Sequence, residues 1–122
     1  MCNKITTEQI LKRYSLGERV FTNLELDGQV FDFSNQSLSN IDFSGSFICA
    51  IFKNANLVGA NFSSTNIKTC DFTDANLAYS NFNNAAIDGA VFDGAKLIGA
   101  CFEGATEQGY VYASNDIPKS SC

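Results

Sequence analysis

A large apolar residue recurs at every fifth position between Phe52 and Phe102, and this spacing constrains the fold more than any other feature. A period of five fits neither an α-helix, with about 3.6 residues per turn, nor a long strand, with a period of two. It fits a short extended piece followed by a tight turn. Because such a unit is too short to bury anything alone, copies of it must stack on one another.

The positions around each large residue are regular as well. A small residue lies two positions earlier, Asn or Asp often lies one position earlier, and Gly, Asn or Asp often lies two positions later. In an extended piece, residues two apart point the same way, so the small and the large residue both face inward. Gly, Asn and Asp suit a turn that needs a positive φ. Each unit is therefore predicted to form one short side of a coil.

Segments such as Ala55-Asn56-Leu57-Val58-Gly59 and Ala75-Asn76-Leu77-Ala78-Tyr79 resemble the A-[DN]-[LF]-x-x unit of the pentapeptide-repeat proteins. The resemblance extends from near Phe31 to Gly104. It implies an all-β solenoid, a right-handed quadrilateral β-helix with four pentapeptides per coil. Since a scaffold defines this family, the resemblance implies little about function.

The order of the large residues supports four units per coil. Phe alternates with an aliphatic residue, and the aliphatic residues alternate between Leu and Ile, so the pattern repeats with every fourth unit. About four coils with four inner ladders are expected. The predicted core ladders are Phe33, Phe52, Phe72 and Phe92; Leu38, Leu57, Leu77 and Leu97; Phe43, Phe62, Phe82 and Phe102; and Ile48, Ile67 and Ile87.

The first step of every ladder is one position shorter than the later steps, so one residue is missing from the segment Cys49–Ile51. This assignment puts Ile48 inward and Phe47 outward. The competing assignment puts Phe47 inward and breaks the Ile ladder. Phe21, Leu26 and Phe31 continue the spacing of five backward, with poor flanking residues, and predict an irregular entry coil.

Both ends of a solenoid need a cover. We expect residues 1–20 to form a helical cap, because Thr6 and Gln9 have the spacing of a capping box before a helix near Thr7–Leu16. Residues 21–105 are assigned to the β-helix. The repeat fails at Glu107, so residues 106–122 are expected to form a C-terminal closure, with Tyr110, Val111 and Tyr112, and a flexible tail from Ser114.

Composition excludes several classes of function. The net charge of −5 argues against binding to the nucleic-acid backbone, which needs a basic surface. No apolar run is long enough to span a membrane. The chain has no His, which removes the commonest general base and metal ligand, and we expect no enzyme, cofactor or metal site. The five cysteines are widely spaced and odd in number, which favours free thiols and a cytoplasmic location. Cys70 is expected to face inward, and Cys49 and Cys101 outward.

One outward position is apolar in successive coils. Val58, Ala78 and Ile98 follow the Leu ladder, one in each coil, and we expect them, with Tyr79 beside them, to form an exposed strip that contacts a partner. We therefore expect a non-enzymatic scaffold or protein-interaction module, monomeric or homodimeric, with an unknown protein partner.

The alternative comes from the family resemblance, since some pentapeptide-repeat proteins mimic DNA and bind type II topoisomerases. The acidic charge agrees in sign, although about four coils at ~4.8 Å each make a rod of only about 20 Å, shorter than those mimics. Such an interface would use the acidic side chains of Asp32, Asp42, Asp71, Asp93 and Glu103.

Overall fold

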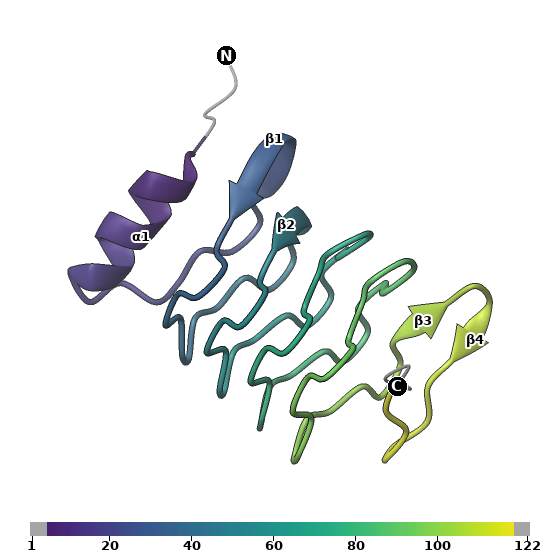
Figure 1. Cartoon of the computed structure of the whole chain (residues 1–122). Helices are drawn as coiled ribbons and strands as arrows, with labels where there is room; N and C mark the ends of the chain where they lie inside the picture. The colour runs from purple at the N-terminus through teal and green to yellow at the C-terminus, as the bar shows by residue number, and fades with distance from the viewer. Residues whose placement is uncertain (1–4, 119–122) are drawn as a thin grey trace.

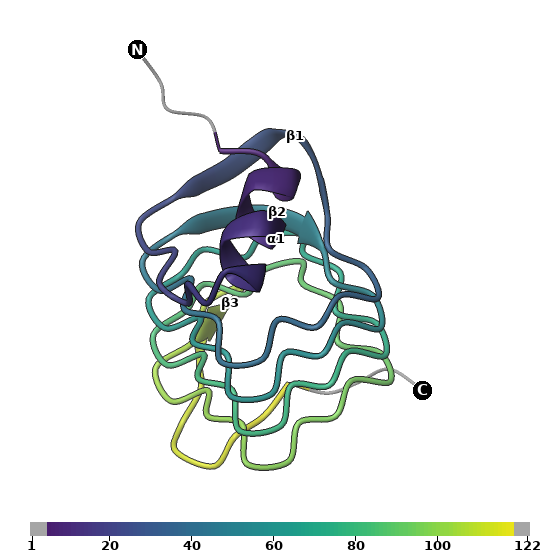
Figure 2. The ribbon, with the colours of Figure 1, turned by 90° about the vertical axis from the view of Figure 1, so that its left-hand side faces the viewer.

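The computed structural model describes residues 5–118, which form a four-sided β-helix. Its coils stack along one axis between a helix at one end and a hairpin at the other (Figure 1). Seen from the helix end, the successive coils have similar outlines and lie one behind another, with the helix in front of them (Figure 2). The elements are α1 (Thr7–Ser15), β1 (Glu25–Asp32), β2 (Phe47–Ile51), β3 (Thr106–Glu107) and β4 (Tyr110–Val111). The other sides of the coils pair through single bridges, because each extended piece is so short.

The pairing between coils follows the predicted periods. Asn56 bridges Asn76, which bridges Lys96, so the regular step equals four units of five. In the same ladder, Ser37 bridges Asn56, and this first step is one position shorter. These bridges confirm that one residue is missing from the step between the first two of these coils.

Strand β2 shows where the missing residue would have been. Its side chains alternate between half-buried and buried positions, with Ile48 and Ala50 inside and Phe47 partly outside. The chain therefore runs straight through Cys49, where other coils turn a corner. Keeping Ile48 inward maintains the Ile ladder, and the competing assignment of Phe47 is wrong.

The four predicted ladders supply most of the large side chains of the core, which also contains small inward residues and residues of the entry coil. All ladder residues are buried except Leu97, which packs against the core but is partly exposed. Phe72 stacks face to face on Phe52 and on Phe92, with ring centroids 5.2 Å apart in both pairs. It meets Phe82 of the other Phe ladder edge to face at 5.8 Å. Two stacked columns of rings in mutual edge-to-face contact thus form the centre of the solenoid.

The entry coil is irregular, as its sequence predicts. The sequence separation between the paired residues Val20 and Asp42 is larger than that between the paired residues Asp32 and Ile51. The start of this coil therefore contains extra residues. The difference is taken up by a bulge between Leu26 and Phe31. Phe31 is buried beside Ala50, in a position that a small residue occupies in later coils.

Helix α1 covers the N-terminal end. Thr6 accepts a hydrogen bond from the backbone of Gln9, and the Gln9 side chain accepts one from the backbone of Thr6, so the capping box is present. Ile10 of α1 is fully buried, and the Tyr14 hydroxyl donates to the Ser39 carbonyl at 2.7 Å. Within residues 5–118 no helix has both the length and the apolar character that a membrane crossing requires.

The C-terminal end is closed by the antiparallel hairpin β3–β4 and the residue after it. Tyr112 is buried, with its ring 6.1 Å from that of Phe102, whereas Tyr110 and Val111 are exposed. The predicted tail from Ser114 contains a turn, because the Ala113 N–H donates to the Asp116 carboxylate and the Asp116 N–H donates to the Ala113 carbonyl. Pro118 is buried, and the rest of the predicted tail lies outside the described residues.

Candidate interaction surface

Tyr79 is a bulky, exposed residue in a left-handed turn on the outer surface. It lies at a turn position with φ +61°, where the preceding and following coils have Gly59 and Gly99. A bulky side chain rarely adopts this left-handed conformation. The residue is 66% exposed, and its ring lies over Gly99, where an added Cβ would come 2.4 Å from a ring carbon.

Ile98 lies next to Tyr79 and is 70% exposed. The Tyr79 N–H donates to the Ile98 carbonyl at 2.9 Å, which fixes the two residues side by side on successive coils. We call Tyr79 and Ile98 the apolar pair. Both side chains are large and mostly exposed, and they lie side by side on the outer surface of successive coils.

The predicted strip is wrong at its centre. Ala78 is only 8% exposed and Val58 is half-buried, so Val58, Ala78 and Ile98 do not form a continuous exposed line. The three residues occupy equivalent positions on successive coils, but the single methyl group of Ala78 is buried. Ile98 and Tyr79 are the exposed members of the predicted set.

The apolar pair lies beside an open backbone edge. In the preceding coil, the Leu77 N–H donates to the Lys96 carbonyl and the Lys96 N–H donates to the Ala75 carbonyl. The equivalent groups of the last coil are the N–H groups of Leu97 and Gly99 and the carbonyl of Ala95. Among residues 5–118 nothing pairs with these groups, because no later coil covers this side.

The acidic side chains are arranged differently from a continuous charged face. At one outward position Ile51, Asp71 and Val91 alternate apolar with acidic residues. The Asp71 carboxylate accepts hydrogen bonds from the backbone and hydroxyl of Thr73, within its own turn. Asp32 has the same arrangement with Ser34, and these hydrogen bonds lower the pKa of Asp32. These carboxylates therefore stabilise local turns.

The three described thiols lie where the repeat predicts them. Cys70 is buried in a small inward position and donates to the Ile48 carbonyl at 3.1 Å; burial raises its pKa to about 12. Cys49 is half-buried, with its sulfur 3.0 Å from the Thr69 hydroxyl, and Cys101 is exposed. Within the described part of the chain, no three His, Cys, Asp or Glu side chains are grouped to hold a metal ion.

Comparisons with known proteins agree with this geometry. The family model for pentapeptide repeats matches 8 copies over residues 32–68, 46–74 and 70–106. The chain thus belongs to the pentapeptide-repeat family and has its right-handed β-helix fold. No curated protein sequence matches the chain.

Solved structures of the family are similar in fold. The pentapeptide repeat protein alr5209 from Nostoc PCC 7120 is 27% identical, with 92% of this chain and 88% of that chain covered and a TM-score of 0.52. HetL, from Nostoc sp. strain PCC 7120 and involved in heterocyst differentiation regulation, is 21% identical, with coverage of 84% and 51% and a TM-score of 0.51. QnrB1, a plasmid-mediated fluoroquinolone resistance protein, is 18% identical, with coverage of 70% and 73% and a TM-score of 0.49.

Proposed function

We propose that this chain is a non-enzymatic interaction module that binds an extended segment of a partner protein along the edge of its last coil. The observation that supports this function most directly is the open edge at Leu97 and Gly99 beside the apolar pair. Unpaired N–H and C=O groups at a sheet edge are a template for strand addition. The backbone would supply hydrogen bonds, and Tyr79 and Ile98 would supply apolar contact.

The rigidity of the solenoid favours this function. Each coil is tied to the next by parallel backbone hydrogen bonds, and the core rings hold the sides at fixed positions. A surface that is already ordered loses little conformational entropy when a partner binds. Two of the carboxylates that a DNA mimic would use, Asp32 and Asp71, accept hydrogen bonds within their own turns, and the apolar residues Ile51 and Val91 lie on either side of Asp71. This arrangement does not favour a DNA mimic.

The test is affinity capture with the wild type and two variants, Ile98→Lys and Val30→Lys. Binding measurements with the purified captured partner follow. Ile98→Lys places a charge in the apolar pair, and we expect it to weaken partner binding at least tenfold. Val30→Lys is the matched control, because Val30 is 75% exposed on the entry coil, away from the last coil. We expect this control to bind the partner as the wild type does.

The salt dependence separates the two candidate functions. Apolar contact and backbone hydrogen bonds should give an affinity that changes little between low and high salt, whereas a contact made by carboxylates should weaken steeply. Equal capture by Ile98→Lys and wild type would contradict the proposed site. Inhibition of gyrase supercoiling by the purified protein, lost at high salt, would favour the DNA mimic instead.

A further inference from the structure

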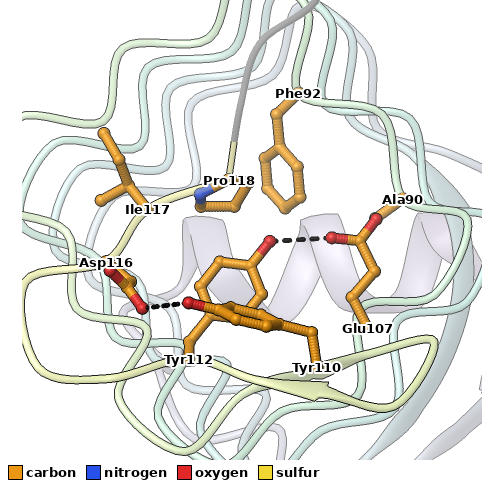
Figure 3. A pocket seen from close by; sticks show the side chains of 8 residues that line it. All are labelled: Ala90, Phe92, Glu107, Tyr110, Tyr112, Asp116, Ile117 and Pro118. Atoms are coloured by element: carbon orange, nitrogen blue, oxygen red, sulfur yellow. Dashed lines mark hydrogen bonds between the residues drawn. The ribbon is translucent and has the colours of Figure 1, made fainter.

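A pocket of about 420 Å³ lies at the C-terminal end of the solenoid, between the last coil and the closing hairpin (Figure 3). Its volume is in the range of small-molecule sites, which is about 300–1,000 Å³. The lining residues that matter here are Phe92, Glu107, Tyr110, Tyr112, Asp116 and Pro118. They come from the last coil, from both strands of the hairpin and from the turn that follows it.

Aromatic rings form much of the wall. Tyr110 and Tyr112 meet edge to face with ring centroids 5.0 Å apart, and Phe92 projects toward them from the opposite side (Figure 3). Tyr112 also packs against Phe102 of the core. The face of an aromatic ring attracts a cation within about 6 Å, more strongly where water is excluded.

Two carboxylates complete the wall, and each accepts from a tyrosine. The Tyr112 hydroxyl donates to Oε1 of Glu107 at 2.8 Å, and the Tyr110 hydroxyl donates to Oδ2 of Asp116 at 2.6 Å. Asp116 Oδ2 also accepts from the Ala113 N–H. Among residues 5–118 the second oxygen of each carboxylate, Oε2 of Glu107 and Oδ1 of Asp116, has no hydrogen-bond partner.

The protonation states agree with this arrangement. Burial and the Glu107 carboxylate raise the pKa of Tyr112, so its hydroxyl stays a donor. The hydrogen bonds from Tyr110 and Ala113 lower the pKa of Asp116, so it stays ionised at neutral pH. None of the described lining residues is Lys or Arg, so no described cation of the chain lines the pocket.

We propose that this pocket binds a small organic cation, an ammonium or guanidinium group on an aliphatic body. Phe92 and the two tyrosines would contact the cation and its aliphatic part, and Glu107 and Asp116 would neutralise its charge. The same two carboxylates repel phosphates and carboxylates. This site does not depend on the strand edge at Leu97 and Gly99, so a test of one proposal does not decide the other.

The test is a titration of the 122-residue protein with each compound, monitored by NMR through the tyrosine ring signals. Choline is compared with 3,3-dimethyl-1-butanol, which has the same shape without the charge. We expect saturable shifts with choline and at least tenfold weaker binding of the neutral alcohol. Lys119 follows Pro118 in the sequence, so the titration is repeated with Lys119→Ala, which removes the ammonium nearest to Pro118 along the chain.

Two further probes identify the source of the cation. Butylguanidinium represents a free guanidinium compound, and N-acetyl-arginine amide represents an arginine side chain of a partner protein. Binding of the free cations alone assigns the pocket to a small molecule, and binding of the arginine amide alone assigns it to a partner protein. Failure of every cation to bind, in wild type and in Lys119→Ala, would overturn the proposal.

Variants of the wall provide the second test. The double variant Glu107→Gln with Asp116→Asn keeps the size and the tyrosine hydrogen bonds but removes both charges, and we expect cation affinity to fall at least tenfold. Glu103→Gln is the matched control, because Glu103 is exposed and does not line the pocket. Thermal unfolding of each variant checks that the fold is kept. Unchanged affinity in the folded double variant would contradict the site.

Discussion

At the scale of single residues, the effect of substituting a glycine in an outer turn depends on the side chain that lies above it. Gly99 adopts φ +70° directly beneath the Tyr79 ring, whereas Gly109 adopts φ +85° with no atom within 4 Å of an added Cβ. The two glycines share a left-handed conformation but differ in their surroundings. Substituting each of them with Ala therefore separates two contributions to the free energy of unfolding: the strain of a left-handed backbone and the clash of the added Cβ with Tyr79.

We expect Gly99→Ala to destabilise the protein by about 2 kcal/mol or more, since it adds the displacement of Tyr79 to a backbone cost of about 1 kcal/mol. Gly109→Ala should show the backbone cost alone. Urea unfolding measures both. In a Tyr79→Ala background the cost of Gly99→Ala should fall to that of Gly109→Ala, and equal costs of the two in the wild-type background would show that the ring contact is unimportant.

Cys70 should make stability depend on alkaline pH. Burial raises its pKa to about 12 from an ordinary value of 9.0, so the folded protein keeps the proton that the unfolded chain releases. This contribution is complete below pH 9 and is lost as the pH rises from 9 toward 12. Between about pH 8 and about pH 10.5 the wild type should lose about 2 kcal/mol more than Cys70→Ala. Unfolding in urea at both pH values measures the difference, and parallel losses would contradict the assignment.

At the scale of the elements, β2 is the place where the repeat departs from itself. The missing residue removes a corner, and Phe47–Ile51 runs as a strand long enough to pair with β1. Its alternation of half-buried and buried side chains makes the register testable, because neighbouring residues point in opposite directions.

Ile48→Ser should destabilise the protein by at least about 3 kcal/mol, because it removes buried apolar contacts and places a hydroxyl in the core. Phe47→Ser should cost clearly less, since Phe47 is only half-buried. Denaturant midpoints of the two variants give the comparison. If Phe47→Ser proved the more damaging, the strand would be shifted by one residue.

At the scale of the whole molecule, the solenoid has a continuous core with unequal ends. Helix α1 covers the first coil, while the hairpin at the other end covers Phe102 and leaves Leu97 partly exposed. In a stack where each coil contacts only its neighbours, a central residue has partners on both sides and a terminal one has partners on one side.

Phe72→Ala should therefore cost about 3–5 kcal/mol, a large part of a typical total stability of about 5–15 kcal/mol. Leu97→Ala should cost less than about 2 kcal/mol, because Leu97 is partly exposed on the last coil. Chemical unfolding with circular dichroism measures both. A Leu97→Ala variant as unstable as Phe72→Ala would mean that the last coil is covered by something more than the described residues.

Much of the fold could be predicted because it is local and repeated. The identity of each inward residue, the coil of four pentapeptides, the residue missing near Cys49 and the capping box at Thr6 depend on spacing along the chain. A repeated backbone unit imposes the same orientation on every copy, so one pattern places many side chains.

The surface needed the tertiary structure. Ala78 has an outward position in the repeat, but its side chain is buried in the folded stack, which the repeat pattern does not predict. Within residues 5–118, the edge at Leu97 is open because the chain leaves the stack after Glu107. Beyond Glu107 the sequence has no period from which positions could be predicted. The pocket at this end forms only because the hairpin and the following turn fold back over the last coil. This folding brings together Glu107, Tyr110, Tyr112, Asp116 and Phe92. Contacts within the repeat follow from sequence distance, whereas contacts at its end depend on packing between segments that share no pattern.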